Sequence, residues 1–367
     1  MKLLTVVGAR PQFIKLAPLC RYLKEHHPSV EHTIIHTGQH YDNNMSEVFF
    51  DELDIPHPNF NLGVGSGSHG KQTGEMLIQI EDVLLQKKPD FLIVYGDTNS
   101  TAAGAFAASK LHIPVVHIEA GLRSFNMMMP EEQNRIITDH LASYLFCPTD
   151  TAVANLKNEG LYNGKPSKLT GYGLVVDNVG DVMYDAVLTS AGLAEKKSMI
   201  LNKLDLGVKS YTLATIHRAE NTDQPARLKV IFDAFGKLDM PVVLPLHPRT
   251  KRYLEQYSIH PSGNIRIIEP VGYLDMILLE KHAQVIMTDS GGVQKEAYFM
   301  RTPCITLRDE TEWVETVDSG WNILVSDLHS IPAAVDTLNL IDFSVKEQMP
   351  LFGDGNSTER IITHLLQ

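Results

Sequence analysis

Two acids stand where apolar runs end in the first half of the chain. Asp97 closes the run FLIVYGD, and Glu119 follows VVHI. Such runs predict buried parallel strands, whose carboxyl ends meet at one sheet edge where ligands collect. We therefore expect both carboxylates to face one cleft, where an acid with a tuned pKa can take a proton from carbon. Two such groups on opposite sides of a ring are the simplest arrangement for inverting a stereocentre, because one proton leaves one face and another arrives at the opposite face.

A third acid is a candidate for the same place. Glu131 follows Pro130, and proline followed by acids is typical of the first turn of a helix. Glu131 therefore has an ordinary alternative role as a capping acid. Its convergence with the two strand-end acids favours a place at the reacting centre.

The segment VIMTDSGGVQKEA has the form of a strand, a small-residue turn and a helix. Ser290, Gly291 and Gly292 would let a diphosphate approach the free N–H groups and the dipole of the helix N-terminus. Glu296, about one and a half turns into that helix, suits the two hydroxyls of a ribose. The segment predicts a nucleotide diphosphate site; the alternative is a serine N-cap followed by a solvated glutamate.

Basic side chains follow other strand-like runs. Arg10 and Lys15 lie in and after the first turn, where they suit a phosphate, although a plain turn with two exposed cations is an alternative. His217 and Arg218 follow TLATI, and His247 follows VVLPL. At one sheet edge these groups could neutralise a departing diphosphate.

These groups need a scaffold of alternating strands and helices, and the sequence supplies it. Short apolar runs alternate with longer helical patterns, which predicts an α/β fold of two Rossmann-like, doubly wound domains with a cleft between them. The pattern pauses at the glycine-containing stretch 168–180, so we place the domains at 1–170 and 171–367. The last helix, ERIITHLLQ, is expected to pack back on the first domain.

Composition narrows the class of protein. The 367 residues are 43% hydrophobic and carry a net charge of −12, which argues against general nucleic-acid binding. No apolar run approaches the roughly 20 residues of a membrane span, and the N-terminus is typical of a first strand rather than a signal peptide. The three cysteines have no metal-binding spacing. We expect a cytoplasmic protein without a metal site or membrane partner.

Taken in order, the motifs resemble one family over essentially the whole chain: the bacterial non-hydrolysing UDP-N-acetylglucosamine 2-epimerases, which have the GT-B two-domain fold. The motifs are GARPQFIK at 8–15, TGQH at 37–40, GDT at 96–98, HIEAGLR at 117–123, PEEQNR at 130–135, HRAEN at 217–221 and DSGGVQKE at 289–296.

The resemblance implies a reaction, and roles for the candidates. UDP leaves C1 while a base takes the C2 proton; the 2-acetamidoglucal is reprotonated on its other face and UDP returns. No cofactor is implied, and a homodimer acting in cell-surface polysaccharide biosynthesis is expected. By resemblance, acid/base and sugar-orienting roles fall to Asp97, Glu119 and Glu131. The diphosphate would lie beside His217 and be bound by Arg10, Ser290 and Gly291, while Glu296 would bind the ribose and Tyr273 would lie near the base. Further candidates for substrate binding are Lys15, Arg135, Arg218 and His247.

Several residues depart from the common family pattern. Gln12, Ala219 and Trp313 look like a branch that includes epimerases acting on UDP-2,3-diacetamido-2,3-dideoxy-glucuronic acid. Many family members also bind a second UDP-sugar as an activator. The corresponding positions here are altered around Gln39, His40, Lys71 and Gln72, which predicts weak or altered activation.

Three other functions remain open on these residues. A glycosyltransferase of the same fold would need an acceptor and would not exchange the C2 proton. A hydrolysing 2-epimerase would release UDP and free sugar. A non-catalytic UDP-sugar sensor would keep the nucleotide motif but has no need of three acids.

Overall fold

The computed structural model of the chain describes all residues except 39–49, 51, 167–172 and 312. It divides into two compact units: unit 1 comprises Met1–Ala186 and Leu351–Gln367, and unit 2 comprises Val187–Pro350. The expected boundary between residues 170 and 171 lies outside the described residues. The division between the units comes later in the chain, within helix α7 (Val182–Lys197).

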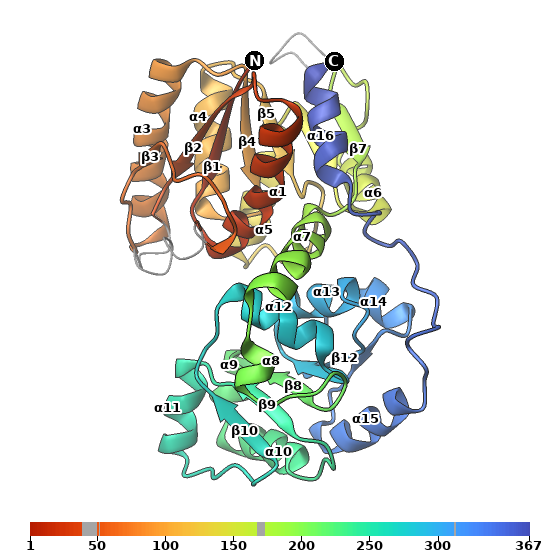
Figure 1. Ribbon diagram of the computed structural model, residues 1–367. Coiled ribbons are helices and arrows are strands. Elements are labelled where there is room, and N and C mark those ends of the chain that lie inside the picture. The colour runs from red at the N-terminus through yellow and green to blue at the C-terminus, as the bar shows by residue number, and fades with distance from the viewer. Residues whose placement is uncertain (39–49, 51, 167–172, 312) are drawn as a thin grey trace. The chain divides into compact units, whose positions relative to one another are not determined.

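Unit 1 is built on a parallel sheet, which in the described residues has the strand order β3-β2-β1-β4-β5-β6-β7 (Figure 1). The strands are β1 (Lys2–Val7), β2 (Glu31–His36), β3 (Phe60–Asn61), β4 (Phe91–Tyr95), β5 (Val115–Ile118), β6 (Tyr144–Cys147) and β7 (Val175–Asn178). Their central members are almost wholly buried, as continuous apolar runs predict. The strand order reverses between β1 and β4, and ligands of such sheets bind at this switch point.

The helices of unit 1 follow the strands. They are α1 (Arg10–His26), α3 (His69–Lys87), α4 (Asn99–Lys110), α5 (Pro130–Leu141), α6 (Asp150–Asn158), the first part of α7, and α16 (Ser357–Leu366). Helix α4 is lined with alanines and packs closely on the sheet, since a Cβ on Gly104 would lie 3.2 Å from Val94 Cγ1. Close packing here fixes the turn between β4 and α4.

The last helix, α16, belongs to unit 1 (Figure 1). The buried carboxylate of Asp185 accepts hydrogen bonds from the backbone N–H groups of Ser357, at 3.2 Å, and Thr358, at 2.7 Å. These are among the N–H groups that a helix N-terminus leaves without intrahelical partners. At the other end of α16, His364 Nε2 lies 2.8 Å from Asp177 Oδ2 on β7.

Unit 2 has a second parallel sheet, with the described order β10-β9-β8-β11-β12-β13. The strands are β8 (Thr212–Thr215), β9 (Val242–Pro245), β10 (Ile265–Ile268), β11 (Val285–Thr288), β12 (Cys304–Thr306) and β13 (Asn322–Leu324). The helices are the rest of α7, α8 (Ile200–Lys203), α9 (Ala219–Thr222), α10 (Pro225–Phe235), α11 (Pro248–Gln256), α12 (Tyr273–His282), α13 (Gly291–Phe299), α14 (Val314–Asp318), η1 (Leu328–Ser330) and α15 (Ile331–Asn339). Its switch point lies between β8 and β11.

The predicted α/β fold with two parallel-sheet domains is confirmed. Across the described part of the chain, no helix is long and apolar enough to cross a membrane. Cys20, Cys147 and Cys304 are unbridged and buried in the interior.

Candidate active site

Asp97 lies in the turn between β4 and α4, at the switch point of the unit 1 sheet. Its Oδ2 accepts a hydrogen bond from Arg135 Nη2 at 2.6 Å, and Arg135 Nη1 donates to Glu132 Oε2 at 2.7 Å. Burial raises the pKa of Asp97 above its ordinary value; the charge of Arg135 opposes that rise, and nearby Glu119 adds to it. A carboxylate with a raised pKa, oriented by a cation, is suited to taking up and returning a proton.

Glu119 follows β5 and reaches the same turn. Its backbone φ is +71°, a left-handed conformation that costs a non-glycine residue on the order of 1 kcal/mol. Its carboxylate is ion-paired with Lys15 of α1, and its Oε2 would lie 3.2 Å from a Cβ added to Gly96. The two strand-end acids are thus neighbours, and Lys15 is paired with one of them. Such strain concentrates at functional sites.

Gln12 links the turns that follow β1 and β4. Its Oε1 accepts from the N–H of Gly8 at 2.8 Å, and its Nε2 donates to the carbonyl of Tyr95 at 2.8 Å and to Thr98 Oγ1 at 3.0 Å. The side chain is buried, at 2% exposure. Gln12, one of the departures from the common pattern, therefore holds the backbone of the Asp97 turn. Arg10, the first residue of α1, is half-buried beside it.

Adjacent acids on α5 have different environments. Glu132 is 1% exposed and its carboxylate accepts from the N–H groups of Ser124 and Phe125, both at 2.9 Å. Burial alone would raise the pKa of Glu132, but these hydrogen bonds and Arg135 bring it below its ordinary value. Glu131, the predicted candidate, is exposed on the same helical turn. Its side chain is available to a ligand, whereas Glu132 is committed to the protein.

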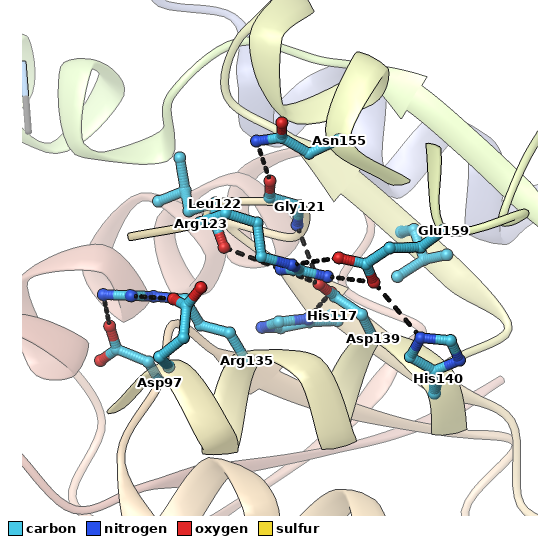
Figure 2. Close-up of polar contacts among 12 residues, drawn as sticks. Asp97, His117, Gly121, Leu122, Arg123, Arg135, Asp139, His140, Asn155 and Glu159 are labelled. Carbon is cyan, nitrogen blue, oxygen red and sulfur yellow. Dashed lines mark hydrogen bonds and ion pairs between the residues drawn. The ribbon is translucent and has the colours of Figure 1, made fainter. Parts of the chain in front are cut away.

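A charged cluster of His117, Arg123, Asp139 and Glu159 contacts the backbone at Gly96 and Gly121, next to Asp97 and Glu119. Figure 2 shows the cluster together with Asp97. His117 of β5 and Asp139 of α5 are both fully buried, with His117 Nδ1 2.6 Å from Asp139 Oδ1. Arg123 donates to Asp139 Oδ2 at 2.7 Å and, with Nε and Nη2, to both oxygens of Glu159 at 2.6 and 2.8 Å. At the exposed side of this cluster, His140 Nε2 lies 3.2 Å from Glu159 Oε2.

In unit 2, a buried aspartate shapes the turn after β8. The Asp289 carboxylate accepts from the N–H of His217 at 3.1 Å, the N–H of Arg218 at 3.0 Å and Asn221 Nδ2 at 3.0 Å. His217 Nδ1 lies 3.3 Å from Asp289 Oδ1, and the side chain is 39% exposed. His217 is thus held at the switch edge with part of its ring open to a ligand.

His247 lies against His217. Their ring centroids are 5.5 Å apart, and His247 Nδ1 accepts from the N–H of Arg249 as the N-cap of α11. Partial burial, His217 and Arg249 lower the pKa of His247, so the ring is favoured in its neutral form. Because Nδ1 accepts, the hydrogen of the neutral ring is on Nε2, which is a hydrogen-bond donor.

The turn after β11 leaves open space at the start of α13. Ser290 is the N-cap of α13, and a Cβ on Gly292 would meet only Ser290 Oγ, at 3.8 Å. Gly291 is the first residue of the helix, and Glu296 lies buried within it. Tyr273, expected near the base, is the first residue of α12 and is only 3% exposed.

Of the positions predicted to bind an activator, Gln39 and His40 lie outside the described residues. Lys71 is exposed and lies 3.8 Å from Glu75 in an i,i+4 pair. Gln72 is buried; it donates to the carbonyl of Gly65 at 3.0 Å and accepts from Asn99 at 2.8 Å. Gln72 thus supports the start of α4, the helix that follows Asp97.

Sequence reasoning missed several supporting residues. Glu132, Asn134, Asp139 and Asp289 hold the candidate groups or their turns, and none was singled out as a site residue. Asn134 does so by donating from Nδ2 to the carbonyl of Asp97 at 2.9 Å. Two had a signal, because Glu132 adjoins Glu131 and Asp289 ends a strand immediately before the serine–glycine turn. Asp139 had none, since its partners lie 16 to 22 positions away on other elements.

Comparison with known proteins identifies the family. The family model described as UDP-N-acetylglucosamine 2-epimerase matches residues 23–366. The chain belongs to this family. The resemblance found in the sequence motifs is therefore confirmed, and with it membership of a family of isomerases.

Relatives of this epimerase family member match it from end to end. A UDP-N-acetylglucosamine 2-epimerase homolog of Methanococcus maripaludis is 53% identical, over 99% of this chain and 98% of the relative. The UDP-2,3-diacetamido-2,3-dideoxy-D-glucuronate 2-epimerase of Pseudomonas aeruginosa is 48% identical, over 100% and 99%. The solved structure of Methanocaldococcus jannaschii UDP-GlcNAc 2-epimerase in complex with UDP-GlcNAc and UDP superimposes with a TM-score of 0.84, at 46% identity, covering 100% of this chain and 99% of that one.

Proposed function

We propose that this protein is a non-hydrolysing UDP-N-acetylglucosamine 2-epimerase that interconverts UDP-GlcNAc and UDP-ManNAc. The observation that carries the proposal is the pair of neighbouring acids Asp97 and Glu119 at the switch point of the unit 1 sheet. Family membership supports the same reaction. The C2 proton passes to a base, the electrons of the C2–H bond form a C1–C2 double bond, and the C1–oxygen bond to UDP breaks. Reprotonation of the 2-acetamidoglucal on its other face and return of UDP complete the inversion.

In this proposal the groups of unit 1 act on the sugar. Asp97 and Glu119 exchange protons with C2, and exposed Glu131 supplies a third acid/base or sugar-orienting group. Arg135 and Lys15, each paired with one of the strand-end acids, favour the ionised form of their partner. Arg10 is assigned to a phosphate oxygen. These roles are supported by the mutual positions of the side chains and by the family's reaction.

The groups of unit 2 act on the nucleotide. Ser290, Gly291 and Gly292 offer the N-terminus of α13 to the diphosphate, and Glu296 accepts hydrogen bonds from the ribose hydroxyls. His217, Arg218 and His247 stabilise the charge on the departing UDP. Tyr273 is assigned to the neighbourhood of the base.

A second substrate has specific support: UDP-2,3-diacetamido-2,3-dideoxy-glucuronate. The relative named for that sugar is 48% identical, and the UDP-N-acetylglucosamine 2-epimerase of Methanocaldococcus jannaschii is 45% identical. Among the residues that suggested this branch, Gln12 makes its hydrogen bonds to the turns after β1 and β4. Gln12 therefore holds the turn that carries Asp97, and it would affect the choice of sugar only through the position of that turn.

Deuterium exchange tests the reaction and the substrate together. Each UDP-sugar is incubated with the protein in deuterated water and followed by proton NMR. Deuterium at C2 with UDP still attached supports the proposal, whereas free sugar with UDP indicates a hydrolysing enzyme. Failure of both sugars to exchange at C2 contradicts the epimerase assignment, and acceptor-dependent transfer would indicate a glycosyltransferase.

A pair of variants at the two ends of β4 locates the chemistry. Asp97→Asn is expected to lower exchange by roughly 10²- to 10⁴-fold, as loss of a general base does, with UDP binding retained. Asp90→Asn is the matched control, because Asp90 is exposed, precedes the same strand and accepts a hydrogen bond from the N–H of Lys2 at 2.7 Å. Equal activity in the two variants would contradict the role of Asp97.

The proposal extends to the setting of the enzyme. A cytoplasmic homodimer that serves cell-surface polysaccharide biosynthesis is what the family resemblance supports. Sedimentation at several protein concentrations tests the dimer, and a mass equal to one chain at all of them would contradict it.

A further inference from the structure

The His117 ring joins the turns that carry the two strand-end acids. Its Nε2 lies 2.8 Å from the carbonyl oxygen of Gly96, the residue before Asp97. Its Nδ1 contacts Asp139, whose Oδ2 accepts from the N–H of Gly121, at 3.2 Å, two residues after Glu119. One buried pair therefore bridges the backbone on either side of the proposed acid/base centre. Figure 2 shows His117, Asp139 and the contact with Gly121.

Both glycines in these turns have left-handed backbones, which this pair helps to hold. Gly96 has φ +61° and Gly121 has φ +78°. Glycine adopts such conformations readily, so its own backbone does little to fix the direction of the chain. The contacts of His117 and Asp139 supply that direction, since a hydrogen bond to a carbonyl or an N–H orients the whole peptide plane.

The hydrogen-bonding partners also define a proton on the ring. A carbonyl oxygen only accepts, so Nε2 of His117 must donate to Gly96. Asp139 accepts from Arg123 and from Gly121 through Oδ2, and its Oδ1 faces Nδ1 of the ring.

We propose that His117 and Asp139 are the positioning pair of the acid/base centre, which sets the spacing of Asp97 and Glu119 by fixing Gly96 and Gly121. This inference rests on the proposed function. Neither residue touches the sugar in this scheme; each acts through the backbone of a turn. A change in spacing by about 1 Å costs on the order of 100-fold in rate, so the pair controls turnover more than binding.

Two substitutions of His117 separate its contacts. In His117→Asn the amide nitrogen takes the place of Nδ1, so the contact with Asp139 can be kept while that with Gly96 is lost. In His117→Gln the amide nitrogen takes the place of Nε2 and can still donate to Gly96. The expected result is a kcat for C2 exchange that falls roughly 10- to 100-fold in His117→Asn and recovers in part in His117→Gln, with KM changed less than threefold in both.

His140→Gln serves as the matched control, because His140 contacts Glu159 at the exposed side of the cluster and reaches neither turn. It is expected to keep its kcat. Thermal unfolding of each variant checks that it is folded. In wild-type protein, ¹⁵N NMR of the His117 ring is expected to show a proton on Nε2, which faces the carbonyl of Gly96, a readout that needs no turnover.

The outcomes are distinct. Wild-type protein that exchanges no C2 proton overturns the proposed function, and the positioning role with it. Active wild type with a folded His117→Asn variant of unchanged kcat overturns the positioning role alone. If His117→Asn does not fold, the test is His117→Gln, which can still donate to Gly96. A folded His117→Gln variant that has lost all of its kcat contradicts the proposal. An Nε2 without a proton contradicts the hydrogen bond from His117 to Gly96, and with it the positioning role.

Discussion

Arg135 lies between two carboxylates, 2.6 Å from Asp97 Oδ2 and 2.7 Å from Glu132 Oε2. The partners differ in exposure, since the side chain of Asp97 is 30% exposed and that of Glu132 only 1%. Glu132 therefore anchors the guanidinium, and the guanidinium orients the acid that remains accessible. Arg135, which orients the proposed base Asp97, is thus itself held in place by the buried carboxylate of Glu132.

The charge of Arg135 is expected to control the pH dependence of the reaction. Burial raises the pKa of Asp97, and Arg135 limits that rise. A base must be ionised, so activity is lost as pH falls through its pKa. Arg135→Met is expected to raise the pKa of Asp97 further and to move the acidic limb of the kcat/KM profile to higher pH. Arg135→Lys, which keeps the charge, should move it less. An acidic limb that stays in place or moves to lower pH in Arg135→Met would contradict this.

Substitutions of the two neighbouring acids of α5 are expected to affect different properties: stability for Glu132 and activity for Glu131. Glu132→Gln should lower the free energy of unfolding by about 1–3 kcal/mol, because charge-assisted hydrogen bonds to buried groups are lost. Glu131→Gln, on the exposed face, should change it by less than about 0.5 kcal/mol yet reduce C2 exchange. Urea unfolding and exchange rates on both variants check this.

The contribution of Glu132 to the free energy of unfolding is expected to decrease as the pH falls. The folded pKa of Glu132 lies below its ordinary value, so its contribution is present above the unfolded pKa and is lost as pH falls through the folded one. The difference between wild type and Glu132→Gln should shrink in acid. A difference that grows in acid would show that Glu132 is not stabilised as a carboxylate.

Glu296 is expected to discriminate between ribose and deoxyribose. A carboxylate that accepts from both ribose hydroxyls loses one partner in 2′-deoxy-UDP, so wild type should bind UDP about tenfold more tightly, or about 1.4 kcal/mol. Glu296→Gln should narrow that ratio. Calorimetric titration of both nucleotides measures it, and Glu255→Gln, an exposed acid of α11, is the control. Equal affinity of wild type for both nucleotides would contradict the assignment of Glu296 to the ribose.

Two glycines with the same backbone angle isolate the effect of packing. Gly121 and Gly164 both have φ +78°, but an added Cβ would lie 2.4 Å from the carbonyl oxygen of Ala152 at Gly121 and would meet nothing within 4 Å at Gly164. Gly164→Ala should cost about 1–2 kcal/mol from its backbone conformation alone. Gly121→Ala should cost more and shift the Glu119 turn, lowering both the melting temperature and the exchange rate. Similar melting temperatures of the Gly121→Ala and Gly164→Ala variants would contradict this expectation, because they would show that the structure relieves the clash at residue 121.

The sequence by itself determined the strands and their ends, because both are encoded locally. Continuous apolar runs that end in a polar residue predict buried parallel strands, and Asp97, Glu119 and Ser290 follow such runs as expected. The pattern DSGG followed by a helical run likewise predicts the open N-terminus of α13. These inferences need only a few consecutive residues each.

Only the tertiary structure decided which groups support the site. Successive residues on a helix point about 100° apart, so Glu131 and Glu132 look alike in sequence while packing buries one and exposes the other. Gln12 meets Tyr95 and Thr98 across more than 80 residues, and His117 meets Asp139 across 22. Such partners are brought together by the order of strands in the sheet and the packing of helices against it, and no local pattern encodes that order.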